Sequence, residues 1–422
     1  MEDSKSDVDI CMSDRLIPSR GSCGELGKMK LERDENWAPQ NDYHAVLSQN
    51  VLGNQSLDTK ILSYKHKPRR QQRQNELSVL YTCNREGASK PKPARVVPQT
   101  AMKVLDAPGL VDNFYNHPID WSSKNVIAVA LGEAVFLFDA TSGRAEKLLT
   151  LPEDLTVTSV RWAGEGAHLS VGTSHGDVQI WDGVAQRQLR NLRGHAGRLG
   201  ALAWHEHVVS SGSTDAEIHH HDVRARDHLV GCLSAHADLI CGLDYSADGA
   251  LASGGNDNVM CIWESAMTRT PLHTLTEHRA AVKAIRWCPW QRHLLASGGG
   301  SADRQVCLWS TSTGKLITST SDAQSQVTGV VWSHQERELL TSHGYSRNQL
   351  SLWKYPALVK YPSDLEGHNG RVLGIAQSPD GSLVCSASAD ETLRFWRVFS
   401  PTSEKQRQGN CDAPNRILKT IR

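Results

Sequence analysis

The sequence predicts an all-β fold built from seven repeated units, and three observations point to it. An apolar triplet that ends in an aromatic residue or a histidine recurs seven times, at positions 138, 181, 221, 263, 309, 353 and 396. The spacing between these positions is 40 to 46 residues. Before several triplets stands a run of small residues with an acid, such as SGGND ending at Asp257. This period and these marks are typical of the WD-repeat β-propeller, with four strands per blade.

The seven units follow one another from residue 101 to residue 400, and most carry the same polar marks. A histidine precedes the small-residue run in four units, and an aspartate stands six residues before the aromatic position. We expect the aspartate to accept a hydrogen bond from the histidine, the histidine to meet a Ser or Thr, and the Trp to cap the set. The four pairs are His195 with Asp215, His236 with Asp257, His278 with Asp303, and His368 with Asp390.

Recurring Ser, His and Asp residues also resemble a catalytic triad, but an active site occurs once and a folding device occurs in every repeat. The clusters 205–207 (HEH) and 219–221 (HHH) could bind a metal ion. His221 takes the Trp position of its blade and the other histidines alternate along strands, so a structural role is favoured. The sequence has no P-loop pattern (G-x-x-x-x-G-K-[ST]) and no H-E-x-x-H zinc-protease pattern. We therefore expect no enzyme activity, no metal and no other cofactor.

Charge and cysteine content exclude several classes of protein. The 46 Lys and Arg residues balance 46 Asp and Glu residues, which argues against nucleic-acid or membrane binding through a basic field. No apolar run is long enough to span a bilayer, and the N-terminal residues have no signal-peptide core. The ten cysteines form no C-x-x-C pair, which favours a reduced, intracellular protein without a zinc knuckle.

The chain divides into three regions. Residues 1–100 are polar and lack periodicity, so we expect a largely disordered arm. Within it, residues 60–73 hold six cations and no acid, which fits a solvated linker, a nuclear import signal or a docking peptide. Residues 101–400 form the predicted propeller, and residues 401–422 a flexible tail.

Short peptides outside the propeller carry a more specific resemblance. DRLIPSR at 14–20 resembles the C-box, and KILSYK at 60–65 the KILxF-type segment, of the fizzy and fizzy-related co-activators of the anaphase-promoting complex. The chain also ends in Ile-Arg, like members of that family. The resemblance implies a substrate-recruiting co-activator found in nucleus and cytoplasm, with ligase subunits, degron-bearing substrates such as cyclins, and checkpoint inhibitors as partners. The implied ligase-docking residues are Asp14, Arg15, Ile17, Pro18, Arg20, Lys60, Ile61, Leu62, Ile421 and Arg422.

The resemblance also implies two sites for degron peptides. A groove between the first and last blades would bind the Leu of a destruction box in an apolar pocket and its Arg on acids. The matching residues are Leu105, Phe136 and Phe138 for the pocket, with Asp106 and Glu391 for the Arg. For Phe136 and Phe138, ordinary blade packing is the alternative.

The second implied site takes a Lys-Glu-Asn (KEN) degron beside the central channel. The matching residues are Asn113, Phe114, Asn256, Asn258, Ser301, Gln326 and Arg371, with Arg371 as the partner of the degron's Glu. Asn113 stands where the family has an acid and Phe114 where it has a Tyr, so we expect KEN peptides to bind more weakly than destruction boxes. Asp112 is expected to face away from this site, because adjacent strand residues point to opposite sides. Asn256 and Asn258 have an alternative role in shaping the SGGNDN turn.

Several features depart from the family pattern. Leu16 stands where the C-box of the family has an aromatic residue, and the repeat position of blade one is Phe138 instead of Trp. The arm contains no Ser-Pro or Thr-Pro. These departures favour a divergent branch, of meiotic or cortex-like type. A generic WD-repeat scaffold for unrelated partners is the alternative function, but it gives no reason for the C-box and the Ile-Arg end to occur together.

Overall fold

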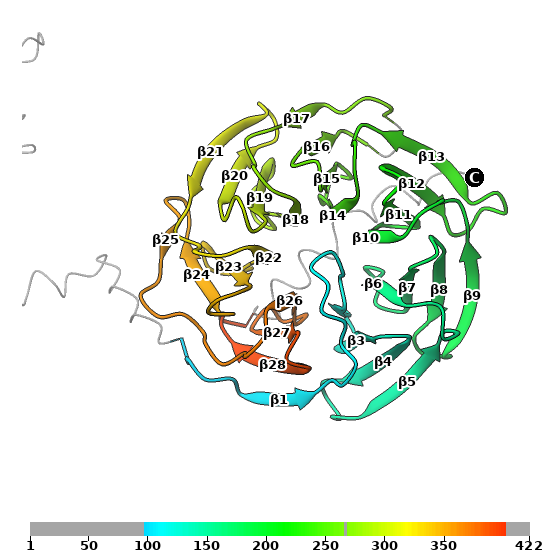
Figure 1. Cartoon of the computed structure of the whole chain (residues 1–422), viewed down its shortest axis with the longest axis horizontal. Coiled ribbons are helices and arrows are strands. Elements are labelled where there is room, and N and C mark those ends of the chain that lie inside the picture. Colours follow the sequence, from blue (N-terminus) through cyan, green and yellow to red (C-terminus); the bar gives the residue numbers. More distant parts are fainter. Residues whose placement is uncertain (1–96, 266–267, 402–422) are drawn as a thin grey trace, which may run out of the picture. The chain divides into compact units, whose positions relative to one another are not determined.

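Seven four-stranded antiparallel sheets form a closed ring (Figure 1), as the repeat predicted. The computed structural model describes residues 97–265 and 268–401, and in these ranges it has strands and turns but no helix that could cross a membrane. The expected disorder of the arm and tail concerns residues that lie almost entirely outside these ranges. All seven repeat positions from 138 to 396 fall on the third strand of a sheet, counted from the channel.

Blades 1 to 3 run outward from the channel in sequence order. Blade 1 contains β2 (Ile119–Trp121), β3 (Val126–Leu131), β4 (Ala134–Asp139) and β5 (Ala145–Thr150). Blade 2 contains β6 (Val157–Trp162), β7 (His168–Thr173), β8 (Val178–Asp182) and β9 (Arg187–Leu192). Blade 3 contains β10 (Leu199–His205), β11 (Val208–Ser213), β12 (Glu217–Asp222) and β13 (Leu229–Ser234).

Blades 4 to 6 repeat this order. Blade 4 contains β14 (Ile240–Tyr245), β15 (Leu251–Gly255), β16 (Met260–Trp263) and β17 (His273–Leu275). Blade 5 contains β18 (Val282–Trp287), β19 (Leu294–Gly299), β20 (Val306–Ser310) and β21 (Lys315–Thr320). Blade 6 contains β22 (Val327–Trp332), β23 (Glu338–His343), β24 (Leu350–Lys354) and β25 (Val359–Lys360).

Blade 7 is completed by a strand from the other end of the propeller. Its three inner strands are β26 (Val372–Gln377), β27 (Leu383–Ser388) and β28 (Thr392–Arg397), and its outer strand is β1 (Lys103–Asp106). Lys103 pairs with Phe395 and Asp106 with Thr392. Figure 1 shows β1 lying along β28 at the rim. Pairing the two ends of the propeller in one sheet closes the ring.

Inner strands of a blade, which are those with another strand on each side, are buried on both faces because neighbouring blades pack against them. Every residue of β16 and β19 is buried, whereas the outer strand β13 has mostly exposed and half-buried residues. This explains why the sequence shows continuous apolar runs such as VMCIW instead of strict alternation.

The expected polar sets are present in four blades. In blade 4, His236 lies 3.1 Å from Asp257 and 2.8 Å from the Ser253 hydroxyl, which also accepts the Trp263 N–H at 3.0 Å. Blades 5 and 7 repeat this arrangement with Trp309 and Trp396. Blade 3 has His221 in the Trp position, and its contact with the Ser211 hydroxyl is longer, at 3.4 Å. The serines are fully buried and already bonded, which favours a structural role.

We predict that Asp390→Asn lowers the free energy of unfolding by about 1.5–3 kcal/mol near neutral pH, because it weakens charge-assisted hydrogen bonds. Asp390 accepts from Thr392 at 2.7 Å and from the Asn369 N–H at 2.9 Å, and it lies 3.0 Å from His368. Burial alone would raise its pKa, but these bonds outweigh burial and lower the pKa from 3.8 to about 2.

Because folding lowers the pKa of Asp390, the stabilisation by its carboxylate is complete above about pH 4 and is lost as the pH falls toward 2. Denaturant unfolding of parent and variant at several pH values measures it. The exposed Asp248, changed to Asn, is the matched control and should shift stability by less than about 0.5 kcal/mol. A penalty for Asp390→Asn that stays constant down to pH 2 would contradict this account.

Candidate functional site

The residues expected to bind a destruction box come together where blade 7 meets blade 1. Leu105 and Asp106 lie on β1, and Glu391 lies in the turn just before β28, opposite them in the same sheet. Phe136 and Phe138 lie on β4 of the adjacent blade. Two segments nearly 300 residues apart in sequence therefore form one seam.

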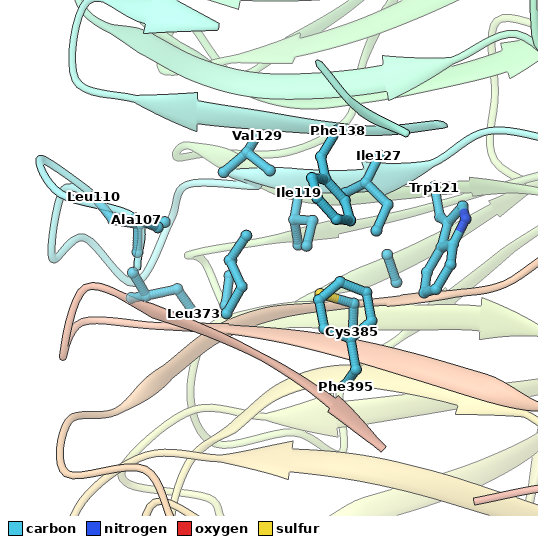
Figure 2. Packing of buried hydrophobic residues seen from close by; sticks show 13 residues of the cluster. Ala107, Leu110, Ile119, Trp121, Ile127, Val129, Phe138, Leu373, Cys385 and Phe395 are labelled. Carbon is cyan, nitrogen blue, oxygen red and sulfur yellow. The ribbon is translucent and has the colours of Figure 1, made fainter. Parts of the chain in front are cut away.

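Phe138 belongs to the packed core of this seam (Figure 2). Its side chain is 7% exposed and its ring centroid lies 6.1 Å from that of Phe395. Leu105 packs against the same cluster while remaining half-buried, and Phe136 is also half-buried. Leu105 and Phe136 thus leave more of their side chains open to a peptide than Phe138 does. Lys103, which the sequence reasoning missed, places its Nζ 4.7 Å from the Phe138 ring.

The two acids of the seam differ in how firmly they are held. The Glu391 backbone has a φ of 59°, its carbonyl accepts the Ala107 N–H at 2.7 Å, and its Oε1 accepts the Gly109 N–H at 3.2 Å. Asp106 is exposed at the end of β1. An exposed carboxylate beside a half-buried apolar surface is suited to a peptide that carries both a cation and an apolar side chain.

All seven residues expected to bind a KEN degron line one cavity. Its volume is about 590 Å³, and it lies where the 112–115 segment approaches the starts of blades 4 to 7. Sequence reasoning had not assigned Tyr115 to this site. The lining residues are Asp112, Asn113, Phe114, Tyr115, Asn256, Asn258, Ala280, Ala281, Gly300, Ser301, Gln326 and Arg371.

The expectation that Asp112 faces away from this cavity is wrong. Residues 111–116 form turns and not a strand, with the Asn113 N–H donating to the Val111 carbonyl at 2.8 Å. Side-chain alternation therefore does not apply, and Asp112 lines the cavity beside Asn113. Its carboxylate accepts a hydrogen bond from Arg371 Nε, while Arg371 Nη2 donates to the Asp112 carbonyl at 3.1 Å. The cavity thus keeps an acid, but that acid is already paired with Arg371.

Hydrogen bonds within the cavity fix several other side chains. Asn113 Oδ1 accepts the Tyr115 N–H at 3.0 Å, as in an Asx turn. The Tyr115 hydroxyl donates to Asn256 Oδ1 at 2.8 Å, and Asn256 Nδ2 donates to Asp238 at 2.7 Å. Tyr115 therefore supplies a hydroxyl one residue after Phe114, and Asn256 is held by its neighbours.

A buried lysine lies next to Phe114, one of the lining residues. Lys283 is 1% exposed, donates to the Leu373 carbonyl, and places its Nζ 5.5 Å from the Phe114 ring. Burial lowers its pKa to about 7, and the charge of Arg371 adds to this effect. Lys283 therefore loses its positive charge more readily than an exposed lysine does. The apolar sequence around Lys283 did not predict that this lysine would be buried next to Phe114.

A second cavity of about 540 Å³ lies at the other ends of the inner strands, lined by residues such as Trp287 and Trp332. Its lining holds two acids and two arginines: Asp244 accepts from Arg161 at 3.2 Å and from Arg286 at 3.1 Å, and Asp120 lies 3.8 Å from Arg161. It therefore offers no free charge of one sign to a ligand.

Two groups in the described ranges could hold a metal ion, and both include His219 on β12: His195, His219 and His221, and Glu217, His219 and Cys232. The residues expected to dock on a ligase, at 14–20, 60–62 and 421–422, lie outside the described ranges.

Comparisons with known proteins agree on one family. The profile of the CDC20/Fizzy WD40 domain matches residues 105–396. The chain is 47% identical over 400 residues to the anaphase-promoting complex subunit cdc20 of Dictyostelium discoideum, covering 90% of this chain and 79% of that one. It is 43% identical over 401 residues to cell division cycle 20.1, cofactor of APC complex, of Arabidopsis thaliana, covering 92% and 87%.

A solved structure is also similar: a chain of the crystal structure of a mitotic checkpoint complex superimposes with a TM-score of 0.70 at 46% identity. The match covers 73% of this chain and 97% of that chain. The profile spans more than half of the sequence, and the relatives match along most of their length. The chain belongs to the Cdc20/Fizzy family of WD40 proteins.

Proposed function

We propose that this protein is a co-activator of the anaphase-promoting complex that recruits substrates to the ligase. The observation that carries the proposal is family membership along most of the chain, with relatives named as subunit or cofactor of that complex. The two peptide sites on the propeller supply a means of holding substrates. The buried, fully bonded serines support a role without catalysis in this chain, so ubiquitin transfer would be performed by other subunits.

Docking on the ligase would use two short anchors on one chain. The C-box offers Arg15 for charge-assisted hydrogen bonds, Ile17 as an apolar anchor, and Pro18 to limit the entropy lost on binding. The terminal Ile421 and Arg422 would form the second anchor, with Lys60–Leu62 adding contacts. Two weak anchors on one chain gain from effective concentration, so each can be short.

The seam between blades 7 and 1 would take the destruction box. Leu105 and Phe136 offer the half-buried apolar surface for its Leu, over a floor that includes Phe138. Asp106 and Glu391 lie at the same end of the β1–β28 strand pair, where both could meet its Arg. Because Glu391 is held by two hydrogen bonds to the 107–109 segment, its carboxylate needs little ordering on binding.

The cavity beside the channel would bind the KEN degron, but binding would require breaking a contact that is already present. The degron's Glu must compete with Asp112 for Arg371, and its Lys meets the neutral Asn113 where the family pattern has an acid. Once displaced from Arg371, Asp112 offers that Lys a carboxylate in the same cavity. We therefore expect KEN peptides to bind more weakly than destruction-box peptides.

Location and inhibitory partners follow from the same proposal. A co-activator works where its ligase and substrates are, so we place the protein in nucleus and cytoplasm, and the basic run at 60–73 could serve import. The likeness to a chain of a mitotic checkpoint complex supports checkpoint inhibitors as further partners.

We predict that Arg15→Ala and deletion of residues 421–422 each reduce co-purification of anaphase-promoting complex subunits by about tenfold or more, because one of two linked anchors is lost. The combined variant should bind still less. Arg33→Ala, in the same arm but outside the C-box, is the matched control. Unchanged co-purification of the combined variant would overturn the co-activator proposal itself.

We predict that Asp106→Ala with Glu391→Gln weakens binding of an R-x-x-L peptide roughly three- to thirty-fold, the range expected for two partly exposed ion pairs. The melting temperature should hardly change, because both side chains are exposed. Fluorescence titration of the full chain measures the affinity, with Glu153→Gln and Asp154→Ala as a matched exposed pair. An equal loss for a peptide lacking the Arg would show that these acids do not contact it.

We predict that Asn113→Asp strengthens binding of a KEN peptide by about three- to tenfold, because the new carboxylate keeps the Asx turn and adds a charge for the degron's Lys. An Ala-Glu-Asn peptide should gain nothing. Titration of both peptides against parent and variant separates the two cases. No gain for KEN, or an equal gain for both peptides, would place the degron's Lys elsewhere.

A further inference from the structure

An exposed cysteine on the rim of blade 3 faces a histidine and a glutamate across one strand pair. Cys232 on β13 is the register partner of His219 on β12, and Glu217 lies two residues before His219 on the same face. Among the six cysteines of the described ranges, Cys232 is the exposed one. Its thiol therefore does not serve as core packing, unlike the buried Cys241, Cys261, Cys307 and Cys385.

The three side chains converge on one point. Glu217 Oε2 lies 3.0 Å from His219 Nε2 and 3.3 Å from Cys232 Sγ, and the three donor atoms all lie within 4.8 Å of one another. Donor atoms bound about 2.0–2.3 Å from a tetrahedral Zn²⁺ stand roughly 3.3–3.7 Å apart. The two separations that involve Glu217 are already within a few tenths of an ångström of this range. The separation of His219 Nε2 and Cys232 Sγ is at most 4.8 Å, so a shift of about 1 Å or less closes the set.

His219, the middle residue of the three, is held in place before any ion binds. Its ring stacks on His195, with centroids 3.8 Å apart and planes 12° from parallel. His195 is fixed in turn by Asp215 at 2.8 Å and by the Ser211 hydroxyl at 2.9 Å. Buried support of this kind fixes the direction of a ligand nitrogen, here Nε2 toward Glu217.

We propose that Glu217, His219 and Cys232 form a three-ligand site for a thiophilic divalent transition-metal ion, of which Zn²⁺ suits the set best. Imidazole nitrogen, thiolate and carboxylate are all ligands of Zn²⁺, and the two anionic ligands neutralise its charge. On binding, the Cys232 thiol releases its proton to solvent and a metal–sulfur bond forms. A remaining coordination position faces water at the rim.

Without an ion, the same groups form a hydrogen-bonded set centred on Glu217. Burial and the Glu217 carboxylate raise the pKa of Cys232 to about 11, so the thiol donates to Glu217 at neutral pH. His219 Nδ1 has no hydrogen-bond partner among the described residues. Moving the imidazole proton to Nδ1 frees Nε2 for an ion; it breaks the contact with Glu217 and leaves Nδ1 without a partner, as it was before.

The inner group of His195, His219 and His221 fits a metal less well. The stacked, nearly parallel rings of His195 and His219 do not direct their lone pairs toward a common point. Both nitrogens of His195 are also engaged by other groups. The group of Glu217, His219 and Cys232 is therefore the one whose geometry suits a metal ion.

Titration of the full chain with Co²⁺, after chelator treatment, tests the site. A cobalt–thiolate bond gives a near-ultraviolet charge-transfer band, and we expect one equivalent of Co²⁺ to produce it and Zn²⁺ to displace it. Cys232→Ser should abolish the band, and Glu217→Gln should weaken Co²⁺ binding by about tenfold or more. Cys288→Ser, which alters a half-buried thiol elsewhere, should leave the band unchanged.

Melting curves without metal establish that each variant is folded, and His219 is left intact because it is buried. Zn²⁺ should raise the melting temperature of the parent and of Cys288→Ser but not of Cys232→Ser. Absence of the band in the folded parent would overturn the proposal. So would a band of equal strength in Cys232→Ser, since another thiol would then bind the ion.

Discussion

Both proposed peptide sites depend on the pairing of β1 with β28. This pairing joins residues 103–106 to residues 392–395 and completes the last sheet of the ring. It places Leu105 and Asp106 on the seam with blade 1, and it directs the following residues across the top of the channel. Without it, blade 7 would expose an unpaired edge, and the 112–115 segment would have no fixed place in the cavity.

The buried His–Asp–Ser sets support the closed ring by fixing loops and turns, and they do not form a binding site. Each ties the loop before one strand to a turn between two others, as His368 does with Asp390 and Ser386 in blade 7. Asp390 directly precedes Glu391, whose carbonyl accepts the Ala107 N–H. The polar set of blade 7 thus fixes the turn on which β1 and one proposed degron acid depend.

Sequence predicted most of the fold, because repeats carry local signals: seven aromatic positions, four His–Asp pairs and the turns between them. It did not predict that β1 completes blade 7, since the pairing spans nearly 300 residues and leaves no local mark. It was wrong about Asp112, because strand alternation was assumed where the backbone turns at Val111–Asn113. Sequence also did not predict that Cys232 lies beside His219 and Glu217, because the register between two strands cannot be derived from either strand alone.

Hydrogen exchange of the full chain, resolved to the segments 103–106 and 392–397, tests most directly whether β1 closes the ring and builds both sites. The account predicts that β1 exchanges as slowly as β28, and that saturating R-x-x-L peptide slows both further. A KEN peptide should slow the adjoining 107–116 segment. Rapid exchange of β1 beside a protected β28, unchanged by either peptide, would contradict the account.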